Sequence, residues 1–303
     1  MTRPSNDQIM SIRQITIIGT GLIGGSLGLA LRKHKFKGKI IGSDRPEVLR
    51  RAKRSCAIDT GVADSLQACD NSDVVVLATP VGTIIELIER LGPHLGNKVL
   101  LTDVGSTKSE IATCAAKVFG DKANKNFLAG HPMAGKENSG IESAHPDLFR
   151  GAVWFITPMG GQTFRSGVAQ EYVSLLKKIG AKIAALDPEV HDQLCAWISH
   201  VPQMISTALA ASLVDEYGED APLLESGGRA LREMTRIAAS PYSMWRDIAL
   251  TNKKSIAEAL LKLEQRLAHI RENLDTRELE EEFSRAHRLR SPTVQTSSKL
   301  RSS

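Results

Sequence analysis

The chain has 303 residues, of which 42% are hydrophobic and 24% are charged, a composition typical of a soluble globular protein with room for two domains. It contains no run of about 18 apolar residues and no N-terminal apolar core like that of a signal peptide, which argues against a membrane span and favours a cytoplasmic location. The formal net charge of +5 is concentrated at the C-terminal end, so the chain as a whole lacks the basic surface of a nucleic-acid-binding protein.

The first half of the chain alternates short β-branched runs with helical patterns. Each run is apolar almost throughout, as expected for parallel strands that are buried on both faces. Helical patterns at 22–34, 46–55, 82–91 and 107–119 separate the first runs, and another follows at 165–179. This alternation predicts an α/β fold with a Rossmann-type, doubly wound parallel sheet. The predicted strands cover 15–19, 39–44, 72–80, 98–106, 127–130, 152–158 and 181–187.

The pattern changes at Asp187. Asp187, Pro188 and Glu189 predict a helix start, with Asp187 as the N-cap and the proline in the first helical position. Residues 190–217 then form a helical pattern that is apolar on nearly every side, which predicts a buried helix; a second subunit could provide that burial. Pro202 should kink this helix.

The rest of the chain up to residue 287 is helical in pattern and contains no strand signal. We therefore predict a dinucleotide-binding domain over 1–186 and an all-helical substrate and dimerisation domain over 187–287. Residues 288–303 form a basic tail without periodicity or stacking aromatic residues, which predicts disorder rather than a nucleic-acid arm. The basic residues near this end are Arg285, Arg288, Arg290, Lys299 and Arg301.

The four cysteines show no spacing typical of metal ligands or of a redox pair. We expect reduced structural thiols and no metal site. The cysteines are Cys56, Cys69, Cys114 and Cys195.

A GxGxxG motif follows the first predicted strand and opens the first predicted helix. The first glycine permits the tight turn, the second lets a pyrophosphate approach the backbone, and the third allows close helix packing. Phosphates would then bind N–H groups at the helix N-terminus. The motif comprises Gly19, Gly21 and Gly24, with Leu22 and Ile23 at the start of the helix.

Asp44 lies at the end of the second predicted strand, 25 residues after Gly19. A carboxylate in this place binds ribose hydroxyls and repels a 2′-phosphate, which favours NAD over NADP. The adjacent Arg45 could instead accept a phosphate, so NADP stays open as a cofactor.

Further candidate residues follow the carboxyl ends of the next strands, where a Rossmann fold binds its ligands. Thr79 and Pro80 end one strand, and Asp103 ends the next. Ser106 comes shortly after Asp103, and His131 follows the run FLAG within LAGHPMAGKENSG. Glycine and proline around His131 favour an irregular loop. Histidine is the side chain best suited to move a proton near neutral pH, so His131 is a candidate base for alcohol oxidation, with Ser106 as the partner that orients it.

Five separated segments together resemble the prephenate and arogenate dehydrogenases of tyrosine biosynthesis. They are GTGLIGGSL, TDVGSTK, GHPMAGKENSG, AWISHVPQM and TRIAASPYSMWRDI, spread over about residues 13–275. The resemblance implies a dinucleotide-binding domain with a helical dimerisation domain, and thus a homodimer. It also implies NAD(P)-dependent oxidative decarboxylation of a cyclohexadienol, with carbon dioxide leaving as the ring becomes aromatic.

The resemblance also implies roles for single residues. His131 matches the histidine that bonds the ring hydroxyl, with Ser106 as its partner, and Arg236 matches an arginine that holds a substrate carboxylate. Glu137 matches an acidic residue that can pair with that arginine. His200 and Trp245 fall in matching segments, where a structural role is an equal alternative for the histidine and nearly so for the tryptophan.

One position departs from part of the family. Many prephenate-using members have a second histidine three residues after the one that corresponds to His200, and here that position is Gln203. An amide accepts as well as donates hydrogen bonds, so Gln203 suits the ammonium of arogenate and can also serve the ketone of prephenate.

Two other functions are compatible with a dinucleotide-binding domain followed by helices. A β-hydroxyacid-type dehydrogenase would rely on a lysine in a GxxxK-like helix and would leave His131 without a role. A non-catalytic NAD-sensing module would need no base beside the nicotinamide. The combination of Ser106, His131 and Arg236 favours the cyclohexadienol enzyme.

Overall fold

The computed structural model describes residues 12–136, 138–158, 167–218 and 226–290. Within these ranges the chain divides into two compact units, residues 1–253 and 254–303. The first unit contains a sheet whose strands run in the order β3-β2-β1-β4-β5-β6-β7-β8. The strands are β1 (Gln14–Ile18), β2 (Lys39–Ser43), β3 (Thr60–Gly61), β4 (Val74–Leu77), β5 (Leu100–Asp103), β6 (Phe127–Pro132), β7 (Val153–Thr157) and β8 (Lys182–Ala185).

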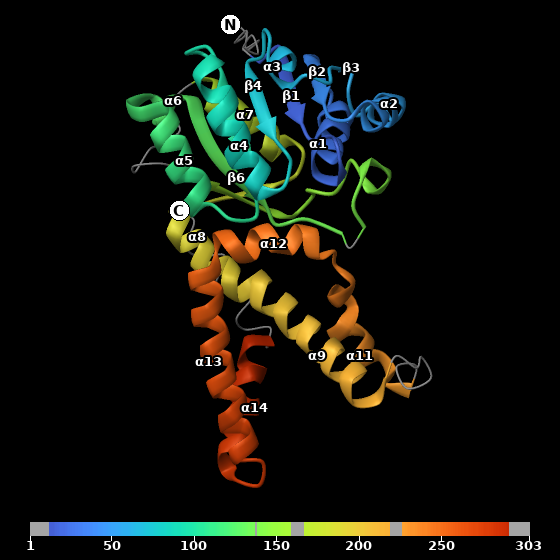
Figure 1. Cartoon of the computed structure of the whole chain (residues 1–303), viewed down its shortest axis with the longest axis vertical. Coiled ribbons are helices and arrows are strands. Elements are labelled where there is room, and N and C mark those ends of the chain that lie inside the picture. The colour runs from blue at the N-terminus through green and yellow to red at the C-terminus, as the bar shows by residue number, and fades with distance from the viewer. Residues whose placement is uncertain (1–11, 137, 159–166, 219–225, 291–303) are drawn as a thin grey trace, which may run out of the picture. The chain divides into compact units, whose positions relative to one another are not determined.

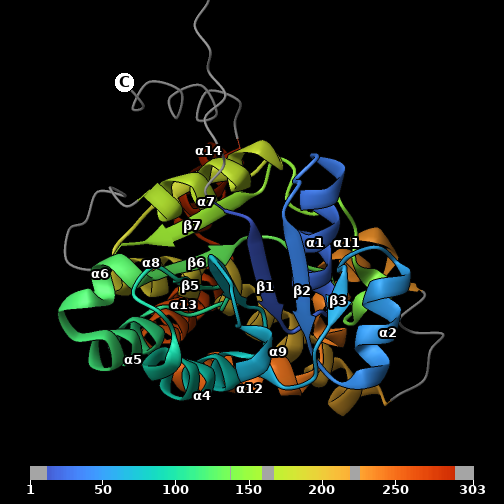
Figure 2. The same ribbon diagram turned by 90° about the horizontal axis from the view of Figure 1, so that it is seen from above.

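Helices cover both faces of this sheet (Figures 1 and 2). Alternate residues of β4 point to opposite faces, so Val74 and Val76 join the core under α1 and α7, while Val75 and Leu77 join the core under α4 and α5. The helices before the chain leaves the sheet are α1 (Leu22–Lys33), α2 (Pro46–Arg54), α3 (Ser65–Ala68), α4 (Val81–Leu91), α5 (Ser109–Phe119), α6 (Ala123–Asn126) and α7 (Gly167–Lys178). The predicted doubly wound α/β fold is confirmed.

The sheet differs from an all-parallel one at a single pairing. β7 runs antiparallel to β6, whereas the other paired strands are parallel. The short strand β3 was not among the predicted strands, because its two residues, Thr60 and Gly61, carry no apolar run.

After the sheet, a long helical stretch begins at Pro188. It comprises α8 (Pro188–Cys195), a π-helical segment (Ala196–His200) and α9 (Val201–Tyr217). Pro202 lacks the N–H that would bond the carbonyl of Ile198 in an α-helix, and the wider π turn falls at this point. The helix type thus changes over the turn before the proline, at the place where the sequence predicted a kink.

The prediction that this stretch is buried on nearly every side is wrong for the single chain. In α9 the buried residues are Val201, Gln203 and Ser206, while Trp197 and Ile198 before them are 45% and 49% exposed. Asp187 begins α8 as predicted, but its side chain makes no capping hydrogen bond.

The remaining helices of the first unit are α11 (Gly228–Thr235), the 3₁₀ turn η5 (Arg236–Ala239) and α12 (Tyr242–Thr251). α12 packs on α4, where Asp247 accepts a hydrogen bond from the Gly82 N–H at 3.1 Å. The Thr251 and Thr107 hydroxyls are 2.7 Å apart and join α12 to the loop after β5. These contacts hold the helical part of the first unit over the carboxyl ends of the strands.

The second unit contains α13 (Lys253–Glu272), which begins at the boundary, and α14 (Arg277–Arg290), which form a helical hairpin (Figure 1). Arg266 pairs with Glu282 at 2.5 Å, and His269 pairs with Glu278 at 3.1 Å. α14 extends through residue 290, past the predicted start of the tail at 288, because its charged pattern continues the helix; residues 291–303 lie outside the described residues. None of the described helices has the length and apolarity that a bilayer span requires.

Candidate active site

The glycine-rich turn between β1 and α1 has the shape that a pyrophosphate needs. Gly19 has a left-handed φ of +91°, and a Cβ there would lie 2.4 Å from the Ala78 carbonyl oxygen. A Cβ on Gly24 would lie 1.9 Å from the Gly19 carbonyl oxygen, so this glycine lets α1 pack closely on the turn. A Cβ on Gly21 would meet no atom within 4 Å, so the turn faces open space where α1 begins. Leu22 and Ile23 form the first, half-buried residues of that helix.

Asp44 is held beside this turn at the end of β2. Its Oδ2 accepts a hydrogen bond from the Thr20 N–H at 2.7 Å, and its Oδ1 accepts from the Arg45 N–H at 2.8 Å. The carboxylate thus lies where ribose hydroxyls could donate to it, at the carboxyl end of the sheet. The Arg45 side chain is exposed and pairs with Glu47 at 3.4 Å.

The ends of β4 and β5 lie next to the same turn. The Thr79 hydroxyl is buried and has no hydrogen-bond partner among the described residues, and Pro80 precedes α4. Asp103 is fully buried, and its carboxylate accepts hydrogen bonds from the Gly105 N–H (2.7 Å), the Gly130 N–H (3.2 Å) and the Lys108 ammonium. Asp103 therefore supports the loop and β6 from within the protein, and its predicted contact with a cofactor stays a prediction.

His131 lies on β6, which extends two residues beyond its predicted end, and not on an irregular loop. The reason is the antiparallel partner, since Ala129–Pro132 pairs with β7 and places His131 opposite Phe155. Its side chain is buried, with 8% of the residue exposed. Because β6 is parallel to β5, His131 lies at the same edge of the sheet as the glycine-rich turn.

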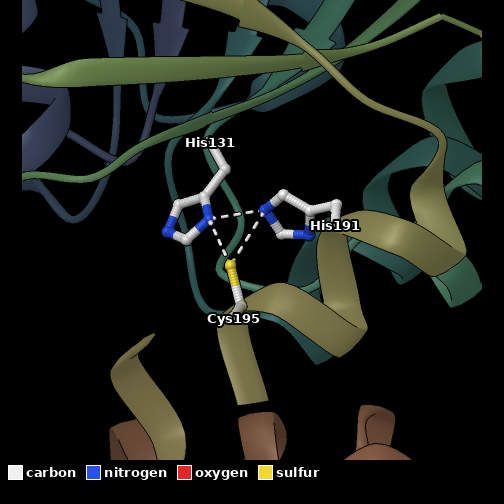
Figure 3. Close-up of side chains that lie close together, drawn as sticks. All are labelled: His131, His191 and Cys195. Carbon is white, nitrogen blue, oxygen red and sulfur yellow. Dashed lines mark hydrogen bonds between the residues drawn. The ribbon is translucent and has the colours of Figure 1, made fainter. Parts of the chain in front are cut away.

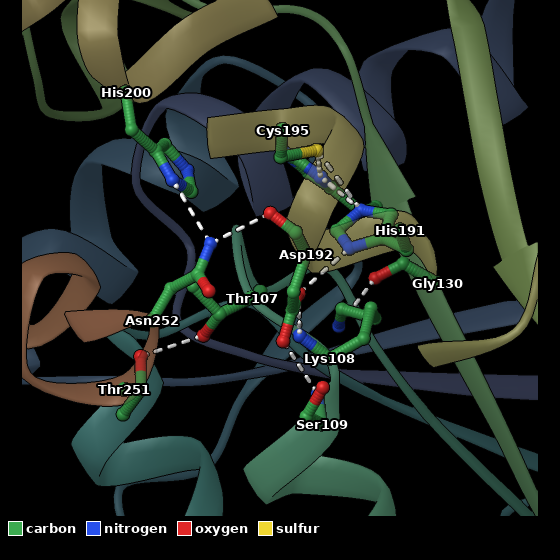
Figure 4. A network of polar contacts seen from close by, with 12 residues as sticks. Thr107, Lys108, Ser109, Gly130, His191, Asp192, Cys195, His200, Thr251 and Asn252 are labelled. Atoms are coloured by element: carbon green, nitrogen blue, oxygen red, sulfur yellow. Dashed lines mark hydrogen bonds and ion pairs between the residues drawn. The ribbon is translucent and has the colours of Figure 1, made fainter. Parts of the chain in front are cut away.

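A chain of hydrogen bonds links His131 to a buried carboxylate (Figures 3 and 4). His131 Nδ1 is 2.9 Å from His191 Nε2, and His191 Nδ1 is 2.9 Å from Asp192 Oδ1. Asp192 in turn accepts from the backbone N–H groups of Lys108 (2.7 Å) and Ser109 (2.9 Å) at the start of α5. The carboxylate is thus fixed by a helix N-terminus, which favours its negative charge.

This chain determines which ring nitrogens carry protons. An ionised carboxylate can only accept, so His191 Nδ1 must donate to Asp192. In a neutral imidazole the other nitrogen is then an acceptor, and His131 Nδ1 must donate to His191 Nε2. A neutral His131 is therefore left with a bare Nε2, on the side of its ring away from His191 (Figure 3).

The electrostatics of the site keep both rings neutral. Burial, followed by the neighbouring His191 and Lys108, lowers the pKa of His131 well below 6.5. Burial also lowers the pKa of His191, against the opposing effect of Asp192. For Asp192, burial alone would raise the pKa, but the hydrogen bonds from His191, Ser109 and Lys108 outweigh it and the pKa is lowered. The lowered pKa leaves the His131 ring unprotonated at neutral pH, the form in which a base can accept a proton.

His200 presents an unpartnered donor nearby. Its Nδ1 lies 3.2 Å from Asn252 Nδ2, which also donates to the Asp192 carbonyl oxygen at 2.8 Å. Burial lowers the pKa of His200 to about 4, so the neutral ring carries its proton on Nε2. This buried Nε2 has no partner among the described residues, and neither does the indole Nε1 of Trp245, whose ring centroid is 6.0 Å from that of His200.

Gln203 fastens α9 to η5. Its Nε2 donates to the Ile237 carbonyl oxygen at 2.9 Å and to the Thr207 hydroxyl at 3.1 Å. A carbonyl oxygen can only accept, so the amide orientation is fixed, and no described residue donates to its Oε1. The buried Ser206 hydroxyl on the same helix also lacks a partner among the described residues.

The other predicted site residues make no described contact with His131. Ser106 is half-buried in the loop after β5, and within the described residues no hydrogen bond joins it to His131; His191 occupies that place. Arg236 is exposed at the start of η5, next to the Ile237 carbonyl that Gln203 binds. Glu137 lies outside the described residues.

Sequence reasoning missed three residues of this site, His191, Asp192 and Cys195. They share one helix, α8, where His191 and Cys195, one turn apart, both lie against His131, and Asp192 holds His191. The Cys195 thiol is 3.4 Å from His191 Nε2. The signal that could have found them is the pattern HDxxC just after the predicted domain break.

Comparison with known proteins agrees with this architecture. Residues 27–185 match the nucleotide-binding domain of prephenate dehydrogenase, and residues 187–288 match its dimerization domain. A prephenate dehydrogenase of Lactococcus lactis is 34% identical over 86% of this chain and 70% of its own length. The crystal structure of A. aeolicus prephenate dehydrogenase with hydroxyphenyl propionate and NAD+ has a TM-score of 0.82 at 31% identity, covering 96% of this chain and 99% of that one.

An arogenate dehydrogenase of Synechocystis has a TM-score of 0.71 at 29% identity, covering 94% of this chain and 99% of that chain. The two domain matches cover the sheet from β2 onward and the helices that follow it, and leave β1 and the glycine-rich turn outside the matched residues. By these matches and the likeness to the Lactococcus lactis enzyme, the chain belongs to the prephenate dehydrogenase family.

Proposed function

We propose that this chain catalyses the NAD-dependent oxidative decarboxylation of a cyclohexadienol, arogenate or prephenate, in tyrosine biosynthesis. The observation that carries the proposal is the hydrogen-bond chain from Asp192 through His191 to His131, which leaves His131 Nε2 as a proton acceptor. His131 lies at the same edge of the sheet as the glycine-rich turn, which is shaped for a dinucleotide. A base at this place suits the removal of a hydroxyl proton from a substrate beside the nicotinamide.

His131 performs the proton transfer in this proposal. Its Nε2 takes the proton of the ring hydroxyl, while its Nδ1–H keeps donating to His191. The hydrogen bond from His131 Nδ1 to His191, whose own tautomer is fixed by Asp192, keeps the His131 ring oriented as its Nε2 accepts the proton. Bound NAD supplies the acceptor for the hydride, and loss of carbon dioxide leaves an aromatic ring.

The helical part of the first unit supplies donors for the carboxylates of such a substrate. The unpartnered Nε2–H of His200, indole N–H of Trp245 and hydroxyl of Ser206 are buried there. A buried donor without a partner costs about 1–3 kcal/mol, a cost that a bound acceptor removes. Arg236 would add a guanidinium that can grip a carboxylate through two parallel bonds.

NAD is the cofactor that the turn and Asp44 support best. The open space at Gly21 and the unpartnered Thr79 hydroxyl fit a bound dinucleotide, and the A. aeolicus relative holds NAD+. We expect wild type to have a higher kcat/KM with NAD than with NADP, because the Asp44 carboxylate repels a 2′-phosphate. Asp44→Ser should reduce that ratio by about tenfold or more, roughly 1.4 kcal/mol. A wild type that prefers NADP would show that Arg45 outweighs Asp44.

The same family match supports a homodimer built on residues 187–287 and a small-molecule substrate. In this proposal residues 1–186 bind the dinucleotide and the helices after Asp187 complete the substrate site and the subunit contact.

The test of the proposed activity is formation of reduced cofactor from NAD with arogenate and with prephenate, together with mass identification of tyrosine or 4-hydroxyphenylpyruvate. His131→Asn, which can donate but cannot take up the proton, should lose about 10²–10⁴-fold in kcat while still binding NAD. Absence of product with both substrates would reject the proposal. A β-hydroxyacid dehydrogenase would reduce NAD with simple hydroxy acids instead, and an NAD-sensing module would bind NAD without turnover.

A further inference from the structure

Two buried side chains, His191 and Cys195, converge on the proposed base His131, and the proton transfer does not require the cysteine. His131 and His191 are joined by the hydrogen bond described above, and the Cys195 thiol lies within reach of both rings (Figure 3). The Cys195 Sγ is 3.4 Å from His191 Nε2 and 3.9 Å from His131 Nδ1. Two imidazole nitrogens and a thiol are ligands that zinc and similar divalent metals prefer.

We propose that His131 Nδ1, His191 Nε2 and Cys195 Sγ form a binding site for a borderline-soft divalent metal such as Zn²⁺, and that metal binding there switches off the base. The inhibitory part of this proposal rests on the proposed function. The metal site itself does not.

The separations of the three candidate ligand atoms lie close to those of a tetrahedral zinc site. With Zn–N bonds of about 2.0–2.1 Å and a Zn–S bond of about 2.3 Å, tetrahedral angles put the ligand atoms roughly 3.3–3.6 Å apart. The three separations between His131 Nδ1, His191 Nε2 and Cys195 Sγ are 2.9, 3.4 and 3.9 Å. Shifts of a few tenths of an ångström in side chains would equalise them. Three protein ligands leave a fourth position for water, as in open zinc sites.

The hydrogen bond from His191 to Asp192 is a second, independent feature that is typical of metal-binding histidines. A histidine that binds a metal usually donates its other ring N–H to a carboxylate, which fixes the tautomer and ring orientation. His191 does this already, since its Nδ1 lies 2.9 Å from Asp192 Oδ1. In addition, His191 and Cys195 are one helical turn apart on α8, the spacing that puts two ligands on one helix face.

Metal binding would change the tautomer of His131. Coordination needs a lone pair on Nδ1, so the proton that this nitrogen donates to His191 must leave it. The neutral ring then carries its proton on Nε2, and the Cys195 thiol releases its proton to solvent. His131 Nε2 is thereby occupied by hydrogen and can no longer accept the proton of a substrate hydroxyl. The metal would therefore abolish turnover without contacting the dinucleotide turn.

The experiment is a titration of the metal-free, full-length protein with Co²⁺, followed by its absorption spectrum. We expect visible bands of tetrahedral Co²⁺ and a near-ultraviolet thiolate-to-cobalt charge-transfer band, which saturate near one metal per chain and disappear when Zn²⁺ is added. Cys195→Ser should lose the charge-transfer band and bind Zn²⁺ more than about tenfold more weakly, because a neutral hydroxyl replaces a soft thiolate. Cys114→Ser, which alters another buried free cysteine, is the matched control and should keep both.

Circular dichroism and NAD binding show whether each variant is folded, and Cys195→Ala provides a second variant if Cys195→Ser is not. Absence of the charge-transfer band in wild type, or its persistence in a folded Cys195 variant, would overturn the metal site.

The inhibitory part of the proposal is tested by measuring activity with added Zn²⁺. We expect Zn²⁺ to lower kcat reversibly, with recovery on chelation and weaker inhibition of Cys195→Ser. Full activity in the Zn²⁺-saturated protein would overturn the switch. A protein that shows the cobalt spectrum but has no dehydrogenase activity without metal would reject the proposed function and leave the metal site standing.

Discussion

At the scale of single residues, the tautomer of His131 is set by a carboxylate that does not touch it. Asp192 is held by two backbone N–H groups at the start of α5, and His191 transmits its preference to His131 Nδ1. His191 is therefore a positioning residue in the proposed reaction. Its substitution should affect turnover in proportion to how well the new side chain accepts a hydrogen bond.

His191→Gln and His191→Leu form a matched pair that tests this role. Glutamine can accept from His131 Nδ1 through its amide oxygen, whereas leucine fills similar space without an acceptor. We expect kcat to fall by about 10–100-fold in the leucine variant and to be largely retained in the glutamine variant, as part of the ~10²–10⁴-fold that a general base contributes. The measurement is kcat and KM for the preferred substrate, with NAD binding as the check on folding.

The pH profile separates positioning from simple packing. A base acts only when neutral, and the pKa of His131 is held well below 6.5, so wild-type kcat/KM should stay level as the pH falls through 6.5. The leucine variant removes His191, one cause of the low pKa, and its acid limb should move to higher pH. Equal kcat in the two variants, with unchanged pH profiles, would show that His191 only fills space.

We expect Gln203 to discriminate between the side chains of arogenate and prephenate. Its N–H groups are engaged by Ile237 and Thr207, so the amide offers its oxygen to a ligand. An acceptor suits the ammonium of arogenate better than the ketone of prephenate. We predict higher kcat/KM with arogenate, and a shift toward prephenate in Gln203→His. Gln203→Leu, which offers neither donor nor acceptor, should lower kcat/KM with arogenate. The ratio of kcat/KM for arogenate to kcat/KM for prephenate should therefore fall. A ratio unaffected by both variants would remove Gln203 from substrate selection.

The sequence indicated His131 and the glycine-rich turn, because glycine spacing and a histidine after a buried strand are local patterns. It did not indicate that His191 would replace Ser106 as the partner of His131. That contact joins β6 to α8 across 60 residues, and no local pattern specifies which of two polar residues arrives there. The supporting part of Asp103 was missed for the same reason, since its partners Lys108 and Gly130 meet it only in the folded chain.

At the scale of elements, most strands and helices followed from periodicity, while pairing direction did not. The apolar run of β7 predicted a strand, but whether it pairs parallel or antiparallel depends on the path of the chain between β6 and β7. The antiparallel pairing matters for function, because it extends β6 and holds His131 in a regular strand. A strand backbone positions a side chain more tightly than a loop does.

Helix capping gives a stability prediction at this scale. Asp187 has the sequence position of a cap for α8 but makes no side-chain capping bond, whereas Asp192, inside α8, accepts from the first N–H groups of α5. Asp192→Ala should therefore lower stability by about 1–3 kcal/mol, since it leaves buried N–H donors unpaired. Asp187→Ala should cost less than about 0.5 kcal/mol. Thermal unfolding at one protein concentration compares the two variants.

The stability that Asp192 contributes should depend on pH in a direction that its pKa defines. The pKa of Asp192 is lowered in the folded state, so its contribution is fully present above the ordinary aspartate pKa and is lost as the pH falls through the lowered value. The gap in melting temperature between wild type and Asp192→Ala should be constant near neutral pH and shrink below about pH 4. A larger loss from Asp187→Ala than from Asp192→Ala would contradict the capping assignment.

At the scale of the whole molecule, the single chain leaves apolar side chains exposed on the helical stretch that begins at Pro188. Val190, Leu194, Trp197 and Ile198 are 47%, 37%, 45% and 49% exposed, and their spacing puts them on one helix face. The sequence predicted that this stretch would be buried, and the single chain does not bury it. In the proposed homodimer a second subunit would cover this face, in agreement with the match of residues 187–288 to a dimerization domain.

A charge placed on this face should weaken the dimer. Ile198→Glu would have to bury a carboxylate among apolar groups, and we expect the dimer dissociation constant to rise by about 30-fold or more, ~2 kcal/mol. Leu66→Glu is the matched control, because Leu66 is similarly exposed, at 42%, but lies on α3 in the dinucleotide-binding half of the chain. Sedimentation velocity over a range of concentrations measures both. If Ile198→Glu stays as dimeric as Leu66→Glu, the exposed face of α8 and the π-helical segment is not the subunit contact, and another surface of the helical region must provide it.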